Sequence, residues 1–138
     1  LNKKYIIIRV PTVVGKTGNP NNLIPLFVNS IKNSLPVNIH ETFRSVLDVS
    51  DLKRIVEYLI LDKFNGEINI NYADLTRIED ILFMLSKILK RKLNINNHVK
   101  KSDKFIINKN DDYVIKILQN LSIGGVGYTE RVLRKYYE

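Results

Sequence analysis

Apolar and polar positions alternate along the chain with two different periods, and these periods predict its strands and helices. A β-branched run over residues 5–10 predicts a buried strand. A helix is predicted over 22–33, because asparagine can cap its start and Pro25 is tolerated in the first turn. Residues 36–39 look extended, and another short strand is predicted over 43–47.

The next segment contains the most regular helical pattern. Apolar residues spaced at i, i+3, i+4, i+7 and i+8 predict a strongly amphipathic helix after Ser50, a candidate N-cap. These apolar positions are Leu52, Ile55, Val56, Leu59 and Ile60. Residues 67–71 then alternate as a strand, and Thr76 with Glu79 predicts a capping box for a second helix that runs to about Arg91.

The last third of the chain is predicted to be polar at first and helical at the end. Residues 94–110 look loop-like around a short apolar run at 104–107. Helices are predicted over 111–121 and 128–137, with a glycine-rich turn between them. The alternation of strands and helices therefore indicates an α/β layer arrangement.

Length and composition limit the class of protein. With 138 residues, no internal repeat and no low-complexity linker, the chain is predicted to be a single piece over 1–138. The absence of cysteine excludes disulfides, thiolate nucleophiles and cysteine zinc sites, and it favours an intracellular, cytoplasmic protein. No apolar run is long enough to cross a membrane, so we expect no membrane partner.

The net charge of +8 raises the question of nucleic-acid binding. Eight lysines or arginines lie between Lys87 and Lys109, opposed only by Asp103. Cations are favourable near a helix C-terminus in any case, so a solvated basic face is one interpretation and an anion-binding surface is the other. Phe105 is the only aromatic residue in the stretch, which gives little basis for stacking on single strands.

The Gly-Lys-Thr at 15–17 suggests a phosphate-binding loop, but its surroundings do not fit one. Val10 occupies the place of the first glycine of the Walker A pattern, and Pro11 has no N–H to donate. As a dinucleotide fingerprint the segment lacks its third glycine and is interrupted by Pro20. The glycines at 124, 125 and 127 are better explained as a turn.

Catalytic residues are equally scarce. His40 and His98 are predicted to be surface residues, since neither has an acidic partner at helical spacing. Asp48 and Asp51 flank the predicted start of a helix, so capping and favourable charge at the helix N-terminus explain them better than a metal site. None of the seven tyrosines begins a Tyr-x-x-x-Lys motif.

The order of several segments resembles a known family. The segments are YIIIRVPTVVG at 5–15, NNLIP at 21–25, RSVLDVSDL at 44–52, LTRIEDIL at 75–82 and RVLRKYYE at 131–138. This order is similar to the C-terminal half of extended short-chain dehydrogenases/reductases, the nucleotide-sugar epimerases and dehydratases of which UDP-galactose 4-epimerase is the familiar example. The resemblance covers nearly the whole chain. It implies a partial Rossmann-like parallel sheet with packed helices, the substrate-binding portion of such an enzyme.

The resemblance also implies roles for individual residues. Pro11 ends a strand that approaches the nicotinamide of the cofactor, and Thr12 stands where the family usually has an asparagine that contacts the substrate. Asn21, Asn22 and Leu23 would lie against the nucleotide. Arg44 matches an arginine that reaches the diphosphate, and Lys100 stands where a second phosphate-binding arginine is common. Two departures are the absence of a Gly-Asp-Gly turn before Arg44 and the replacement of a common histidine by Asp48.

In the family, the glycine-rich loop and the catalytic Tyr-x-x-x-Lys precede the strand that begins at Tyr5. The resemblance therefore implies a chain that is inactive alone and does not bind a cofactor tightly, completed by an N-terminal Rossmann half. The whole protein would bind NAD or NADP and a nucleotide-diphosphate sugar, act in polysaccharide biosynthesis and be compatible with a homodimer. The alternative is a free-standing basic module that binds nucleic acid or an acidic protein, and of these nucleic acid is the less expected partner.

Overall fold

Strands and helices alternate along the computed structural model, which describes residues 3–16, 18–100 and 108–138. In chain order the elements are β1 (Ile6–Arg9), β2 (Thr12–Val14), α1 (Leu23–Lys32), β3 (Val37–His40), β4 (Phe43–Asp48), α2 (Val49–Leu61), β5 (Gly66–Asn69), β6 (Leu75–Arg77), α3 (Ile78–Leu89), β7 (Ile95–Val99), α4 (Asp112–Asn120) and α5 (Tyr128–Tyr137). The predicted α/β class is confirmed.

Within these described ranges the strands form three small sheets. β1 pairs with β5 in parallel, from Ile6 opposite Gly66 to Arg9 opposite Asn69. In the central sheet β4 lies between β2, which is parallel to it, and β6, which is antiparallel. β3 and β7 form a third, parallel pair.

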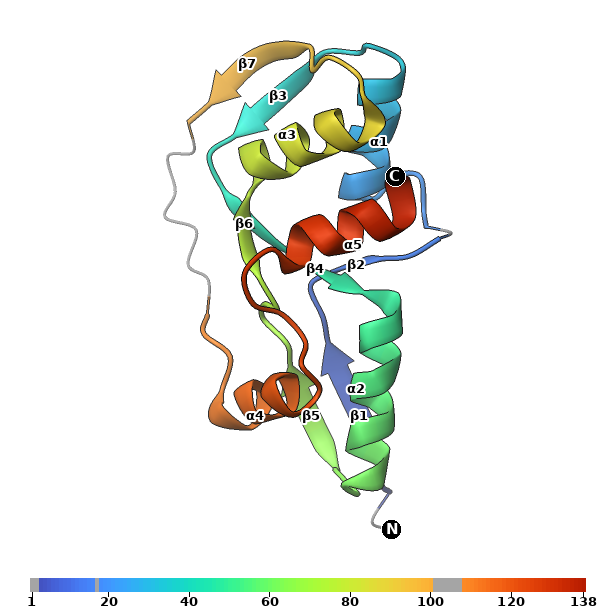
Figure 1. The fold of residues 1–138 in the computed structure, drawn as a ribbon. Coiled ribbons are helices and arrows are strands. Elements are labelled where there is room, and N and C mark those ends of the chain that lie inside the picture. The colour runs from blue at the N-terminus through green and yellow to red at the C-terminus, as the bar shows by residue number, and fades with distance from the viewer. Residues whose placement is uncertain (1–2, 17, 101–107) are drawn as a thin grey trace.

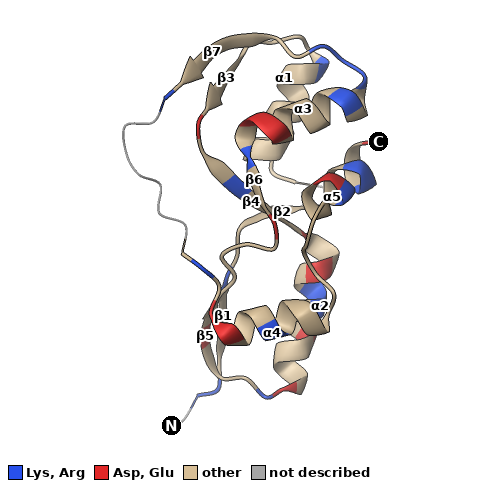
Figure 2. Cartoon of the chain, turned by 60° about the vertical axis from the view of Figure 1, so that its left-hand side comes forward, with Lys and Arg blue, Asp and Glu red and all other residues tan. Residues whose placement is uncertain are grey.

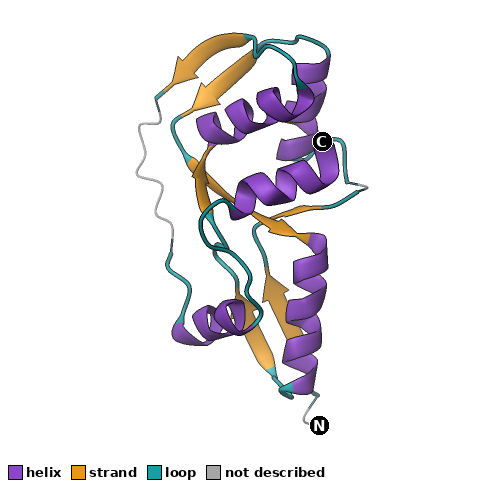
Figure 3. Ribbon diagram, in the orientation of Figure 1, coloured by secondary structure: helices purple, strands orange, loops and turns teal. Residues whose placement is uncertain are grey.

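The sheets and helices divide the molecule into two regions. In Figure 1 the lower region contains β1, β5, α2 and α4, and the upper region contains β3, β7, α1 and α3. Helix α5 lies between them, in contact with α3, β2 and β4. Figure 3 shows the same arrangement coloured by type of element. The last helix of the chain is therefore placed against the central sheet, where the two regions meet.

Buried aliphatic side chains from both regions make up the core. The side chains with less than 2% exposure include Ile24, Ile31, Ile39, Val46, Leu47, Ile55, Leu59, Ile81, Leu82, Leu85, Ile117 and Leu133. The amphipathic pattern predicted for α2 holds at Ile55 and Leu59, but Ile60 is 60% exposed. The helical period therefore identified the buried centre of the apolar face of α2 but predicted a wider buried face than the structure has.

Two predicted helix caps are wrong. Asp48, and not Ser50, is the N-cap of α2, and its side chain accepts a hydrogen bond from the backbone N–H of Ser50 at 2.9 Å. The capping box before α3 is not formed, because the hydroxyl of Thr76 bonds that of Thr129 and Glu79 pairs with Arg77. Tertiary partners therefore occupy the side chains that local spacing assigned to a cap.

Several observed strands and helix ends also differ from the predicted ones, mostly because strand pairing defines them. The predicted loop over 94–110 contains β7, a polar strand that exists because its backbone pairs with β3. The short strands β2 and β6 were also not predicted, since each has three residues and is defined by pairing with β4. α3 ends at Leu89, before the predicted Arg91, and Lys90 has a left-handed conformation. The apolar run at 104–107 lies outside the described residues.

Within the described part of the chain, no helix combines the length and the apolar character needed to cross a membrane.

Candidate functional site

A cleft in the upper region is the candidate site, because two of the predicted site residues, Leu23 and Arg44, line it. It lies between α1, the β3–β4 segment and the start of α3, and it has a volume of about 480 Å³. This size is within the range of ligand pockets, roughly 300–1,000 Å³. Its apolar wall comes mainly from α1, and its polar groups come from α1, β3 and β4. Residues that line it include Leu23, Phe27, Ser30, Asn38, His40 and Arg44.

Arg44 is the permanent cation of this cleft. It is the second residue of β4 and is half-buried. Its Nη1 donates hydrogen bonds to the backbone oxygen of Phe43 at 3.1 Å and to the hydroxyl of Thr42 at 3.4 Å. These contacts orient a planar guanidinium group at the wall of the cleft, and such a group suits a carboxylate or phosphate ligand.

Strand pairing brings a second basic residue, Lys100, beside the segment that leads to Arg44. His40, at the end of β3, lies opposite Val99 of β7, and the N–H of Glu41 donates to the oxygen of Val99 at 3.2 Å. Lys100 follows Val99 directly and is exposed. The pairing of β3 with β7 thus carries Lys100 beside the segment that leads to Arg44, although the two are 56 positions apart in the chain.

Of the predicted site residues, Leu23 and Arg44 line the cleft together. Asn22 is the N-cap of α1 but makes no side-chain capping bond, and Asn21 is exposed, with its N–H bonded to the side chain of Asn19 at 2.9 Å. Neither asparagine is among the lining residues. Both asparagines directly precede the first residue of α1, Leu23.

Of the remaining predicted residues, Thr12 lies on the central sheet and Pro11 directly precedes it. Thr12 is half-buried on β2 and lies opposite Val46 of β4, two positions beyond Arg44. Pro11 is half-buried between β1 and β2. Neither lines the cleft.

Sequence reasoning missed several lining residues. His40 was considered only as a surface histidine, and Ser30 and Asn38 were not considered. Both predicted histidines are exposed, as expected. The signal that could have singled out His40 is its position four residues before Arg44, within the segment where the family pattern is broken.

The Gly-Lys-Thr segment has a structural explanation. β2 leads into Gly15 and Lys16, and the next helix begins only at Leu23. A Cβ on Gly15 would lie 2.9 Å from Cγ1 of Val49, so glycine permits close packing against the start of α2. Because no helix N-terminus follows Lys16 directly, the segment lacks the geometry of a phosphate-binding loop.

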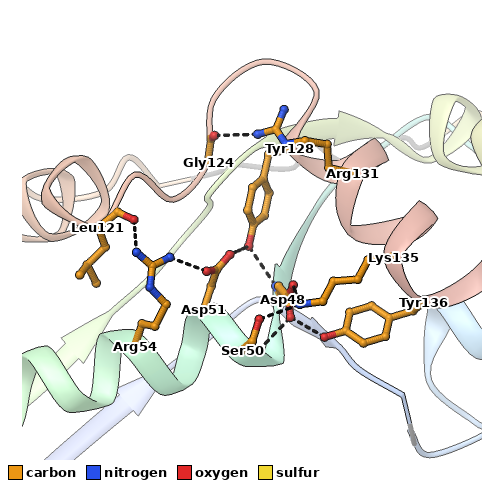
Figure 4. Close-up of polar contacts among 10 residues, drawn as sticks. All are labelled: Asp48, Ser50, Asp51, Arg54, Leu121, Gly124, Tyr128, Arg131, Lys135 and Tyr136. Carbon is orange, nitrogen blue, oxygen red and sulfur yellow. Dashed lines mark hydrogen bonds and ion pairs between the residues drawn. The ribbon is translucent and has the colours of Figure 1, made fainter.

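A second polar cluster lies where α5 meets the start of α2 (Figure 4). Asp48 is 5% exposed, and its carboxylate accepts hydrogen bonds from Nζ of Lys135 at 2.7 Å and from the hydroxyl of Tyr136 at 2.6 Å, besides the N–H of Ser50. Burial alone would raise the pKa of Asp48, but these donors outweigh it and lower the pKa below its ordinary value. Asp48 is therefore held as a carboxylate inside the chain.

Tyr128 extends the cluster to Asp51. The backbone N–H of Asp48 donates to the Tyr128 hydroxyl at 3.0 Å, and that hydroxyl donates to Asp51 at 2.8 Å. Burial and the bond to Asp51 raise the pKa of Tyr128, so it stays neutral. Arg54 also pairs with Asp51 at 2.8 Å and bonds the oxygen of Leu121. We call this set, centred on Asp48, Asp51, Tyr128, Lys135 and Tyr136, the Asp48 network.

The prediction that Asp48 caps a helix is therefore confirmed, and the structure adds partners from α5 that the local sequence did not indicate. Among the described residues, no group of His, Asp and Glu side chains is arranged to hold a metal ion.

No protein-family model matches this sequence, and no curated protein sequence matches it. Solved structures do match its fold. UDP-glucose 4-epimerase from Thermus thermophilus, solved with NAD, matches with a TM-score of 0.73 at 14% identity. The match covers 97% of this chain and 45% of that one.

Two further matches are of the same kind. The dTDP-glucose 4,6-dehydratase of Bacillus anthracis, solved with NAD, has a TM-score of 0.69 at 18% identity, covering 96% of this chain and 43% of that one. UDP-N-acetylglucosamine 4-epimerase from Methanobrevibacter ruminantium, solved with UDP-N-acetylmuramic acid, has a TM-score of 0.69 at 21% identity, covering 97% and 45%.

The chain has the fold of the C-terminal portion of extended short-chain dehydrogenases/reductases. It spans less than half the length of these solved structures. The resemblance predicted from the order of sequence segments is thus confirmed at the level of the fold.

Proposed function

We propose that this chain is the substrate-binding portion of an NAD- or NADP-dependent nucleotide-sugar epimerase, dehydratase or reductase. The observation that carries the proposal is the cleft itself. In a fold matched by such enzymes, it places a guanidinium group, Arg44, opposite an apolar wall that includes Leu23 and Phe27. A nucleotide-diphosphate sugar has the matching chemistry, since it joins a diphosphate to a base and a sugar.

The roles follow from this arrangement. Arg44 binds the diphosphate through parallel N–H donors, and Lys100 adds positive charge at the end of β7 without a bidentate grip. Leu23 and Phe27 pack against the nucleoside. Asn21, Asn22 and Thr12 are proposed to contact the nucleotide sugar, as the resemblance implies.

The cofactor requires residues beyond these. A dinucleotide is held by a glycine-rich turn that leads from a strand into a helix. Here β1 leads through Pro11 into the strand β2 instead, so this turn does not fit a dinucleotide. We propose that NAD or NADP binds in an N-terminal Rossmann half, with Pro11 near the nicotinamide, and that this chain does not catalyse hydride transfer alone. The homodimer, the cytoplasmic location and a role in polysaccharide biosynthesis stay predictions from the resemblance.

Binding of UDP-glucose to the 138-residue chain tests the proposal, measured by isothermal titration calorimetry. We expect Arg44→Ala to weaken binding by about 30-fold, because a charge-assisted contact to the diphosphate is lost. Arg77→Ala is the matched control, since Arg77 is an exposed arginine on β6 that pairs with Glu79 and does not belong to the lining of this cleft. It should leave the affinity unchanged.

The proposal is wrong if neither UDP-glucose nor dTDP-glucose binds to the folded chain, or if both arginine variants bind as wild type does. Circular dichroism checks that each variant is folded.

The alternative basic module has weaker support. Lys87, Lys90, Arg91 and Lys92 lie at the C-terminal end of α3 and just beyond it, where the helix dipole favours cations, and Lys100 lies at the far end of β7 (Figure 2). The alternative predicts nucleic-acid binding that weakens steeply with salt, which a filter-binding titration at several salt concentrations measures.

A further inference from the structure

The two histidines of the chain lie on neighbouring strands but differ in their relation to the cleft. His40 ends β3 and lines the cleft with Arg44. His98 lies on β7 opposite Ile39 and is not a lining residue. Both are exposed. The chain therefore contains a cleft histidine and, beside it, a comparable histidine outside the cleft.

His40 lines the cleft together with the polar residues Asn38, Thr42 and Arg44. It is four residues from Arg44 along the β3–β4 segment, and its partner across the sheet, Val99, directly precedes Lys100. Arg44 therefore lines the cleft with the imidazole, and Lys100 follows the residue paired with His40 without itself being a lining residue. The lining residues of α1 and α3 are Leu23, Leu26, Phe27, Ser30 and Ile78, none of which is charged.

We propose that His40 is a further binding residue of this cleft: its protonated ring donates a hydrogen bond to the diphosphate, so affinity for the nucleotide sugar increases as the pH falls. The inference rests on the proposed function, because it requires that the ligand of Arg44 is a diphosphate. It assigns to this chain a charged contact whose strength varies near neutral pH.

Other charged groups near His40 do not produce the same dependence. Arg44 and Lys100 are of types that ordinarily keep their positive charge between about pH 5 and pH 8, and Glu41, which adjoins His40, is of a type that ordinarily keeps its negative charge. Histidine is the side chain that ordinarily changes charge in this interval. The diphosphate of a nucleotide sugar, esterified at both ends, keeps a constant charge over the same interval. A change of affinity with pH therefore reports on a histidine.

Calorimetric titration of the 138-residue chain with UDP-glucose at about pH 8 and about pH 5.5, at constant ionic strength, tests the proposal. Wild type should bind about fivefold more tightly at the lower pH, the size expected for one added charge-assisted contact at a partly exposed site. His40→Gln should abolish this increase, because glutamine can donate a hydrogen bond but cannot become charged. His98→Gln should retain it.

The outcomes distinguish a failure of the role of His40 from a failure of the proposed function. If His40→Gln retains the pH dependence, or His98→Gln loses it, His40 does not have this role, while the proposed function stands as long as Arg44→Ala weakens binding. If wild type binds neither UDP-glucose nor dTDP-glucose at either pH, both the role of His40 and the proposed function are overturned. Both substituted side chains are exposed, so the variants should fold, and circular dichroism verifies this at both pH values.

Discussion

The cleft and the Asp48 network are both polar clusters, but they use their polar groups differently. In the Asp48 network, donors from α2 and α5 surround a buried carboxylate. In the cleft, polar side chains stand at the wall of a cavity of about 480 Å³. A cluster whose bonds close within the chain contributes to stability, whereas one that borders an accessible volume can bind a ligand.

The Asp48 network and the cleft also differ in which parts of the chain they bring together. The Asp48 network connects α5 to the start of α2, across 87 positions between Asp48 and Lys135. The cleft is lined mainly by the consecutive segments from α1 to β4, and Ile78 at the start of α3 completes it. We therefore expect substitutions in the network to change the free energy of unfolding and substitutions in the cleft to change affinity.

The largest effect is expected for Asp48→Ala. It removes a helix cap and leaves the Tyr136 hydroxyl and Lys135 without their carboxylate, which should lower the free energy of unfolding by about 3 kcal/mol. Urea denaturation measures this. Glu67→Ala is the matched control, because its ion pair with Arg9 is about half exposed on both sides and should be worth less than about 1 kcal/mol.

Asp48→Ala also tests whether the Asp48 network and the cleft have separate roles. Folded Asp48→Ala should bind UDP-glucose as wild type does, and Arg44→Ala should lose affinity with little loss of stability. If Asp48→Ala weakens binding as strongly as Arg44→Ala does, the Asp48 network belongs to the ligand site.

A smaller effect is expected at the turn before α5. Gly124 has a φ of 94°, and a Cβ there would lie 2.3 Å from the backbone oxygen of Ala73. Gly124→Ala should destabilise the fold by about 2 kcal/mol, through backbone strain and displacement of the turn. Gly125 has a φ of 84° but faces open space, so Gly125→Ala should cost about 1 kcal/mol.

Thermal or urea denaturation of the two glycine variants separates these contributions. Equal destabilisation would mean that strain alone matters and that the contact with Ala73 does not hold the turn in place.

The smallest effect is the dependence of stability on acid pH. The pKa of Asp48 is lowered in the folded state, so its contribution to stability is present above its ordinary pKa of 3.8 and is lost as the pH falls through the lower, folded value. The free energy of unfolding of wild type should therefore decrease below about pH 4. In Asp48→Asn this decrease should be shallower. Parallel curves for the two proteins would show that Asp48 does not titrate with folding.

Much of the fold could be predicted from the sequence where one face of an element is buried. The helices α1, α2, α3, α4 and α5 and the strands β1 and β5 each correspond to a predicted segment, because burying apolar side chains imposes a period. The polar strand β7 has no such period, since its residues are mostly exposed and its strand geometry comes from pairing with β3.

The candidate site could be predicted only in part. Leu23 and Arg44 were identified through the order of sequence segments, and both line the cleft. His40 and His98 are both exposed histidines in polar surroundings, and the one sequence signal that distinguishes His40 is its position four residues before Arg44. Which of them borders the cleft depends on the register of β3 and β7, and this register is a long-range property.

By itself, the sequence determined the α/β class, the positions of the main helices and the likeness to one half of an enzyme family, because periodic burial and segment order are properties of the chain. Only the tertiary structure decided which polar residues are neighbours. In the folded chain Asp48 accepts hydrogen bonds from Lys135 and Tyr136, and Arg44 and His40 line the same cleft. The physical reason is that hydrogen bonds and cavities depend on distances in space, which local spacing does not fix.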